Sequence, residues 1–193
     1  MTIRPDPASA HEPVFASAEA AALREALIAQ LPDPFTHAGA TRLLARQLGS
    51  AAWRQPVSVV GPREATAIQL ACALRVGRIL GAARMPVLCG GKNGVMAAVS
   101  EGVSLSGGVV IGLLPEDDTS LANPHLTVAL PTGLGITRNA LVARAARAMI
   151  AIGGGLGTTS EMALALQWGK PVFAIHGAPD VPGHQRYEDE MAM

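Results

Sequence analysis

Short apolar runs alternate with longer helical stretches from Val57 onward. Six runs read as buried strands, at residues 57–60, 86–89, 109–114, 126–130, 148–152 and 171–175. The stretches between them predict helices at residues 65–83, 94–105 and 137–147, and a last helix after the glycines at 153–157. Continuous apolar strands separated by helices are typical of a parallel sheet covered on both faces. The alternation therefore predicts an α/β fold with a doubly wound parallel sheet.

The first 55 residues do not follow this alternation. They begin with a stretch rich in Pro, Ala and charge, which predicts a loose tail. Two helices are predicted at residues 17–30, with Ser17 as N-cap, and at 36–50. We expect residues 1–55 to form a tail and helical extension that packs on the core or on another subunit. Residues 56–193 are expected to form the ligand-binding domain, with an irregular tail after His176.

Composition excludes several classes of protein. Of the 193 residues, 49% are hydrophobic and 16% are charged, which argues against disorder. The 15 basic residues balance the 15 acidic ones without a basic block, so there is no electrostatic basis for a nucleic-acid partner. The chain contains neither an apolar run of about 18 residues nor an apolar signal core near Met1, which predicts a cytoplasmic protein without a membrane segment. Cys72 and Cys89 are expected to be buried and reduced.

Three glycine-rich loops follow predicted strands and open predicted helices. They lie at residues 90–94, 133–139 and 153–158. In a parallel sheet all three would lie at the same edge, where ligands of doubly wound folds bind. Helix N-termini carry free N–H groups, and glycine lets these donors approach an anion closely. The three loops together favour a phosphate-type ligand, with tight turns alone as the alternative.

The familiar nucleotide motifs fit poorly. A P-loop would need Ser or Thr after Gly91-Lys92, but Asn93 stands there. The dinucleotide fingerprint is nearly met by Gly155 and Gly157, but Ser160 occupies the position of the third glycine. NAD is therefore not expected. The five histidines are scattered along the chain, which does not indicate a metal site.

The sequences GGKNGVMAAVSEGVSLSGGVVIGLLP, TGLGITRN and GGGLGTTSEMALALQWGKPV together resemble one protein family. They are similar to the molybdenum cofactor carrier-like branch of the Lonely-guy/DprA-related (SLOG) superfamily, over residues 56–176. The resemblance implies a Rossmann-like fold and a homo-oligomer, either a dimer or a tetramer. Carriers of this type bind and protect molybdenum cofactor, a phosphate-bearing pterin, so the resemblance also implies this molecule as bound cargo.

Lonely-guy enzymes, once labelled lysine decarboxylases, form the sister branch. They hydrolyse nucleoside 5′-monophosphates to the base and ribose 5-phosphate. Their signature is Pro-Gly-Gly-x-Gly-Thr-x-x-Glu, with an Arg-Lys pair on the preceding helix. Here Gly153 replaces the proline and Asn139 replaces the lysine, whereas Arg138 and Glu161 match. The resemblance thus implies Arg138 and Glu161 as catalytic residues if the protein is a hydrolase.

Each of these residues also has a purely structural interpretation. Thr158-Thr159-Ser160-Glu161 matches a capping box, in which Thr158 caps the helix and Glu161 reaches back to the cap N–H. Arg138 is disfavoured at a helix start, which suggests a bound anion, although a salt bridge would also explain it. Asn139 either contacts ligand or caps a helix. Lys92 is a further uncertain phosphate ligand, and Glu116 is expected in a solvated loop.

The sequence favours a binding protein for a phosphate-bearing pterin or nucleotide, and a nucleoside 5′-monophosphate phosphoribohydrolase is the alternative. A nucleotide-sensing module without catalysis is a third alternative. No metal site is predicted. The predicted ligand-binding residues are Gly61, Arg63, Gly90, Gly91, Asn93, Gly94, Gly133, Gly135, Thr137, Arg138, Asn139, Gly154, Gly155, Gly157 and Thr158.

Overall fold

The computed structural model describes residues 17–30 and 55–188, and the helix predicted at 36–50 lies outside them. Seven strands form one parallel sheet in the order β4-β3-β2-β1-β5-β6-β7. Their bounds are β1 Val57–Val60, β2 Val87–Cys89, β3 Val110–Leu114, β4 Val128–Pro131, β5 Ala148–Ile152, β6 Val172–Ile175 and β7 Gln185–Arg186. The helices are α1 Ala18–Gln30, α3 Ala67–Ala82, α4 Val95–Leu105, the 3-10 turn η2 Gly135–Arg138, α5 Asn139–Ala145 and α6 Leu156–Gln167.

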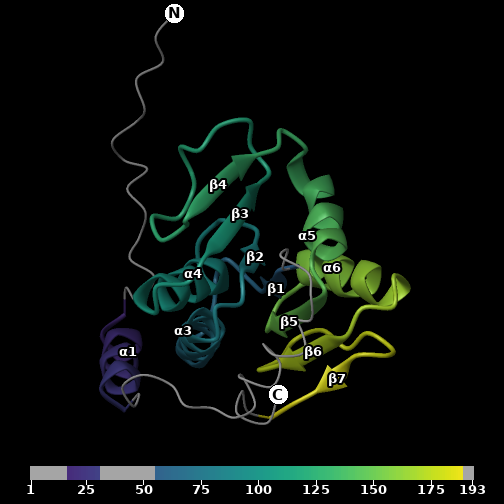
Figure 1. Ribbon diagram of the computed structural model, residues 1–193. Helices are drawn as coiled ribbons and strands as arrows, with labels where there is room; N and C mark the ends of the chain where they lie inside the picture. The colour runs from purple at the N-terminus through teal and green to yellow at the C-terminus, as the bar shows by residue number, and fades with distance from the viewer. Residues whose placement is uncertain (1–16, 31–54, 189–193) are drawn as a thin grey trace, which may run out of the picture.

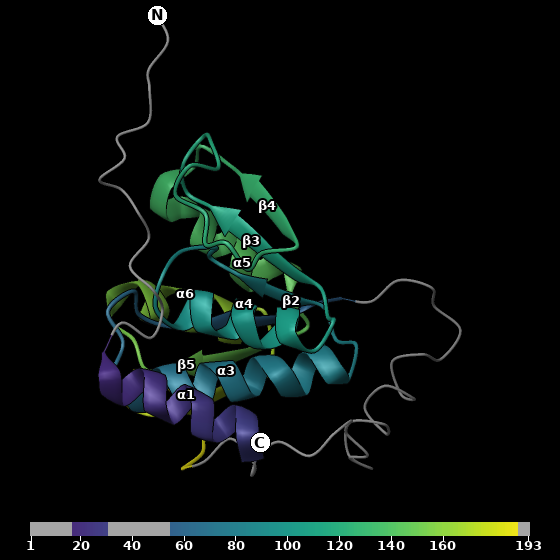
Figure 2. The same cartoon turned by 90° about the vertical axis from the view of Figure 1, so that its left-hand side faces the viewer.

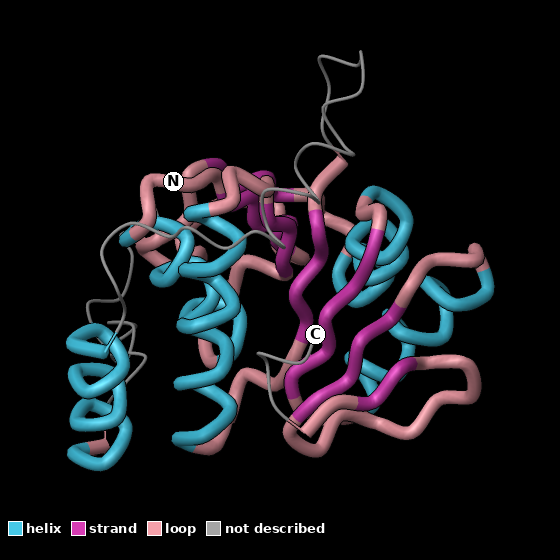
Figure 3. Tube along the Cα trace, turned by 60° about the horizontal axis from the view of Figure 1, so that its bottom comes forward, coloured by secondary structure: helices cyan, strands magenta, loops and turns pink. Residues whose placement is uncertain are grey.

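Helices cover both faces of the sheet, as the apolar strands require (Figures 1 and 3). Successive strand residues point to opposite faces, so Val57 and Val59 pack with α3 and α4. Val60 joins the other core cluster, which includes residues of α5 and α6. The predicted doubly wound α/β fold is therefore confirmed.

The chain reverses its direction of travel across the sheet at β1. Strands β1 to β4 are laid down in order toward one edge, and the chain then returns to place β5 on the other side of β1. Helix α3 follows β1 on one face, and α6 follows β5 on the other. Because the loops after β1 and β5 diverge to opposite faces, a crevice opens beyond the carboxyl ends of these strands.

Helices α3 and α4 pack closely where each presents a glycine. A Cβ added to Gly102 would lie 2.1 Å from the carbonyl oxygen of Leu74, and one added to Gly77 would lie 2.2 Å from that of Val99. Both contacts are with backbone, which cannot move aside without shifting a helix. Figure 2 shows the two helices side by side on one face of the sheet.

Replacing Gly102 with Val is expected to lower the free energy of unfolding by about 2 kcal/mol, because overpacking forces the two backbones apart. Chemical denaturation of the variant and the parent measures the change. Ser104→Val is the matched control, because Ser104 is exposed on the same helix. Equal stabilities for Gly102→Val and the control would contradict the packing described here.

Helix α1 packs along the outer side of α3 (Figures 1 and 2). The backbone N–H of Ala20 donates to Ser17 Oγ at 3.0 Å, which confirms Ser17 as the N-cap. Ala20 is buried in the core cluster of this face. Arg24 Nη2 lies 2.6 Å from Oε1 of the buried Glu101 on α4. Packing of this part of the extension on the core is thus confirmed, whereas the domain boundary at residues 55 and 56 stays a prediction.

Some predicted elements differ from those observed. The stretch after His176 was predicted to be irregular, but it contributes β7, which pairs with β6 through Phe173↔Gln185 and Ala174↔Arg186. This two-residue strand has no apolar run to mark it, because both of its side chains are exposed. The helix predicted at 137–147 is divided into η2 and α5. Within the described ranges, no helix is both long and apolar enough to cross a membrane.

Candidate functional site at the carboxyl edge of the sheet

A cleft of about 300 Å³ lies beyond the carboxyl ends of the strands. Its walls come from the segments after β1, β2, β3, β4 and β5. The three glycine loops therefore lie at one edge, as the parallel sheet predicted. The cleft coincides with the switch point between β1 and β5, where doubly wound folds bind ligands. Its volume is at the lower end of the range for small-molecule sites.

The N-terminus of α6 opens onto this cleft without a side-chain cap. Gly155 is the N-cap residue, and no side chain accepts a hydrogen bond from the first turn. The first backbone hydrogen bond of the helix runs from the N–H of Thr159 to the carbonyl oxygen of Gly155. The preceding backbone donors, from Leu156 to Thr158, have no acceptor within the helix. Together with the helix dipole, these donors form a favourable place for an anion.

The capping box predicted for Thr158 and Glu161 is wrong. Helix α6 begins three residues earlier than that motif requires, so Thr158 lies inside the first turn rather than at the cap. Its side chain instead lies against Gly154, where an added Cβ would be 2.4 Å from Thr158 Oγ1. Gly154 has a φ of 133°, which disfavours any other residue. The carboxylate of Glu161 is therefore not used as a cap.

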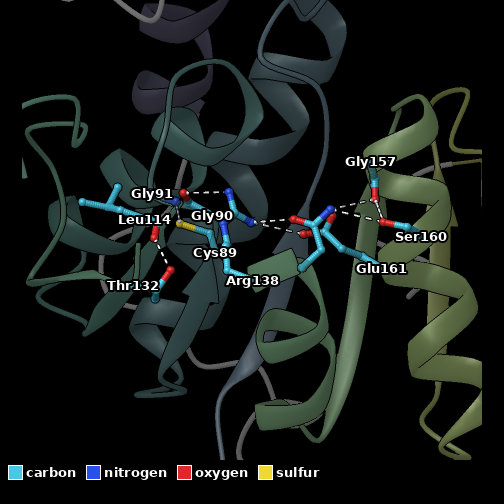
Figure 4. Close-up of polar contacts among 10 residues, drawn as sticks. Cys89, Gly90, Gly91, Leu114, Thr132, Arg138, Gly157, Ser160 and Glu161 are labelled. Carbon is cyan, nitrogen blue, oxygen red and sulfur yellow. Dashed lines mark hydrogen bonds and ion pairs between the residues drawn. The ribbon is translucent and has the colours of Figure 1, made fainter. Parts of the chain in front are cut away.

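Glu161 instead faces Arg138 inside the cleft (Figure 4). Both side chains are buried, with 6% of each residue exposed. Arg138 Nη1 lies 3.5 Å from Glu161 Oε1, which is longer than a normal charge-assisted hydrogen bond. Arg138 Nη2 donates to the carbonyl oxygen of Gly90 at 3.1 Å. The third nitrogen of the guanidinium, Arg138 Nε, is buried and has no hydrogen-bond partner in the described structure.

Gly90 allows Arg138 to occupy this position. A Cβ at residue 90 would lie 2.4 Å from Arg138 Nη2 and 2.7 Å from the sulfur of Met96. Any larger residue would therefore displace the guanidinium from the floor of the cleft. The first glycine loop thus acts on the site through the arginine that it accommodates.

Asn139 joins the segment after β4 to the start of α6. Its Oδ1 accepts from Arg138 Nη1 at 3.1 Å. Its Nδ2 donates to Ser160 Oγ at 3.2 Å and to the carbonyl of Gly157 at 3.4 Å. Asn139 therefore holds Arg138 on one side and the first turn of α6 on the other, and its contact with a ligand stays a prediction.

Burial is the main influence on the pKa values of the ionisable groups in and beside this cleft. It raises the pKa of the Glu161 carboxyl to about 7, although the Arg138 guanidinium opposes the shift. Burial also lowers the pKa of Arg138, which Glu161 opposes. The pKa of the Cys89 thiol is raised by burial, so this neighbouring cysteine stays neutral. The cleft thus contains a permanent cation beside a carboxyl group that titrates near neutral pH.

A second ion pair lies beside the site. Lys92 is buried, and its Nζ lies 2.6 Å from Glu116 Oε1. Although burial alone would raise it, this ammonium holds the pKa of the Glu116 carboxyl below its ordinary value. Lys92 is therefore paired with Glu116 and is not among the residues that line the cleft, so a phosphate contact by Lys92 stays a prediction. Glu116 is not simply a solvated loop residue. Among the described residues, no cluster of His, Cys, Asp or Glu could hold a metal ion.

Comparison with known proteins assigns the family. The sequence profile of the SLOG cluster4 family matches residues 54–192. The chain belongs to the SLOG cluster4 family. Among solved structures, the molybdenum cofactor binding protein from Rippkaea orientalis aligns with a TM-score of 0.64 and 36% identity, covering 65% of this chain and 78% of that one. The molybdenum cofactor carrier protein from Chlamydomonas reinhardtii aligns with a TM-score of 0.65 and 28% identity, covering 71% and 91%.

One relative of this SLOG protein has an enzyme name. The cytokinin riboside 5′-monophosphate phosphoribohydrolase of Rhodococcoides fascians is 31% identical over 110 residues. The match covers 55% of this chain and 54% of the relative. The predicted membership of the SLOG superfamily is therefore confirmed, with relatives of two different functions.

The SLOG fold brings many of the predicted site residues to the cleft and leaves others outside it. Those that line it are Gly61, Arg63, Gly90, Gly135, Arg138, Asn139, Gly155, Gly157, Thr158 and Glu161. Those that do not are Gly91, Asn93, Gly94, Gly133, Thr137 and Gly154. The roles of both sets in ligand binding stay predictions.

Sequence reasoning missed an apolar part of the SLOG cleft. Val60, Pro62, Met96, Pro115 and Ile136 also line it, and none of the aromatic side chains in the described part of the chain does. Met96 was assigned to the core, and it is indeed buried, but one side of it faces the cleft. Ile136 is 75% exposed, which is unusual for a large apolar residue. Its position inside the TGLGITRN motif was the signal available in the sequence.

Proposed function

We propose that this protein binds a phosphate-bearing pterin or nucleotide, in the manner of the molybdenum cofactor carriers that it resembles. One observation carries the proposal, namely that the uncapped N-terminus of α6 and the buried guanidinium of Arg138 line the same cleft. Backbone donors of the first turn would bind the phosphate, and Arg138 would add a charged donor. Its buried, unpartnered Nε fits this role.

The apolar residues of the cleft suit the rest of such a ligand. Met96 and Ile136 line the same space as the charged groups, which supports a molecule with an anionic group and a flat ring. Molybdenum cofactor would be cargo in this proposal, released intact rather than converted. The expected phosphate-bearing partner and the cytoplasmic location belong to the same proposal.

A phosphoribohydrolase is the second candidate, and Glu161 is the observation that favours it. A buried carboxyl group with a pKa of about 7, opposite an arginine, is suited to acid–base work at neutral pH. In this role the carboxylate would position water or stabilise the oxocarbenium-like ribose during cleavage of the N-glycosidic bond. The enzyme name of the Rhodococcoides fascians relative supports the same candidate.

Two experiments distinguish these functions. Protein purified from a molybdenum-replete host is assayed for bound molybdenum and for the fluorescence of oxidised pterin, and it is then titrated with supplied molybdenum cofactor. A carrier retains or binds the cofactor, and failure to bind it contradicts that function.

In the second experiment, the protein is incubated with AMP and related monophosphates, and free base is measured. Release of base by the parent but not by Glu161→Gln supports the hydrolase, whereas no release across the panel excludes it.

The homo-oligomer implied by the family resemblance is also proposed here. Large apolar side chains are exposed on β4, at Val128 and Leu130, and on the segments that follow it, at Leu134 and at Leu141 of α5. β4 is an edge strand, with free backbone groups along its outer side. A second copy of the chain would cover this surface, and the molar mass in solution measures whether it does.

A further inference from the structure

If the cleft binds a phosphate, two anionic groups compete for contact with Arg138. The first is Glu161, which contacts Nη1 only loosely, at 3.5 Å. The second is the incoming phosphate, which the free donors of α6 would place in the same cleft. Glu161 lies on α6 itself, near the turn that provides those donors. A carboxylate and a phosphate so close together repel each other, and the repulsion is stronger because the Glu161 carboxylate is buried.

The charged and titratable groups around this pair come from four segments of the chain. Arg63 follows β1, Cys89 ends β2, Glu116 follows β3 and Arg138 ends η2. Arg138 stays cationic, because an arginine keeps its proton at neutral pH, and Cys89 stays neutral, because burial raises its pKa. Glu116 stays anionic, because its pKa lies below the ordinary value. Glu161 is the only ionisable side chain of α6. Because its pKa is about 7, it is the group of this set that can change its charge near neutral pH.

We propose that ligand binding in this cleft is coupled to the uptake of one proton by Glu161, so that the phosphate replaces the carboxylate as the anionic partner of Arg138. The proton comes from solvent and is held on a carboxyl oxygen of Glu161, and no other bond is made or broken. This inference rests on the proposed binding function and adds to it a dependence on pH. Affinity would be high in mildly acidic conditions and would fall as the carboxyl group ionises.

The size of the effect follows from the ionisation of Glu161. Burial already raises the pKa of this carboxyl to about 7, so protonation is easily reached at neutral pH. A ligand that binds only the protonated form would find about nine tenths of the protein competent at pH 6 and about one tenth at pH 8. The dissociation constant is therefore expected to rise about tenfold between these pH values.

The probe must not titrate itself. A phosphate monoester changes its charge near pH 6, which would confuse the measurement. Adenosine 5′-sulfate carries one fixed charge across this range, and AMP is measured alongside it. Calorimetric titrations are made from pH 6 to pH 8, in two buffers whose heats of ionisation differ, so that the protons taken up are counted directly.

For the parent protein and the sulfate ester, we expect the tenfold rise in dissociation constant and uptake of about half a proton at pH 7. Glu161→Gln is expected to bind with no proton uptake, and with an affinity at pH 8 close to that of the parent at pH 6. Glu116→Gln is the matched control, because it alters a nearby carboxylate that stays ionised, and it should keep the parent's pH dependence.

The outcomes separate this inference from the proposed function. Binding by the parent with a constant affinity and no proton uptake overturns the inference and leaves the proposed function standing. The same pH dependence in Glu161→Gln as in the parent also overturns the inference, because another group would then take the proton. No binding of either adenosine compound at any pH overturns the nucleotide site, and the inference with it.

Discussion

Replacing Arg138 with Gln is expected to weaken binding of a phosphate-bearing ligand about 100-fold, which corresponds to about 3 kcal/mol. Arg138 is the buried cation of the cleft, and its Nε has no partner in the described structure. Glutamine retains a donor but removes the charge and the planar fork that suit a phosphate. Calorimetric titration of parent and variant with AMP at pH 6 measures the loss.

The Arg138→Gln variant is expected to keep the fold of the parent protein. Removing Arg138 would leave the buried carboxyl of Glu161 without its cation, but that group can become neutral by binding a proton. Arg144→Gln is the matched control, because Arg144 lies in α5, 5.1 Å above the ring of Trp168 and away from the cleft. Equal affinities for Arg138→Gln and the control would show that Arg138 is a structural ion-pair residue rather than a ligand-binding one.

Replacing Glu161 with Gln is expected to stabilise the protein at pH 8 by about 3 kcal/mol more than it does at pH 4. Burial raises the pKa of this carboxyl from its ordinary 4.5 to about 7 in the folded chain. The folded state therefore binds more protons than the unfolded state between these values. The stability that this proton contributes is complete below pH 4.5 and is lost as the pH rises to about 7. Glutamine is neutral throughout and does not undergo this loss.

Chemical denaturation of the parent and of Glu161→Gln, at several pH values from 4 to 8, measures this difference. Taking the difference between the two proteins removes the contribution of every other titrating group. Arg138 does not reverse the sign, because its attraction for the carboxylate is already opposed by the larger effect of burial. A difference that stays constant with pH would contradict a buried, neutral-titrating Glu161, as would one that falls as the pH rises.

The fold and the place of the site were predictable because they depend on patterns spread along the chain. Apolar runs such as 57–60 and 148–152 have no polar face, so they need cover on both sides, and the parallel sheet follows. Parallel strands then bring their carboxyl ends to one edge. Three loops separated by many residues in sequence, at 90–94, 133–139 and 153–158, were placed at the same edge by this argument alone.

The contacts inside the site were not predictable, because they depend on side chains distant in sequence. Thr158 and Glu161 have the spacing of a capping box, but the local pattern could not reveal that α6 starts at Leu156. Arg138, 23 residues before Glu161, provides a partner that competes with any local role for the carboxylate. Lys92, in the loop after β2, likewise carries no local sign of Glu116, its partner in the loop after the neighbouring strand β3. Strand β7 was not predicted, because its two exposed residues form no apolar pattern in the sequence.

The central claim is that the cleft beyond β1 and β5 holds a phosphate against the first turn of α6. A crystal structure of the protein grown with saturating AMP at pH 6 tests it most directly. We predict phosphate oxygens within hydrogen-bond distance of the backbone N–H groups of Leu156 to Thr158, with the guanidinium of Arg138 beside them. A nucleotide bound elsewhere, or a cleft that holds no phosphate at saturation, would contradict this account.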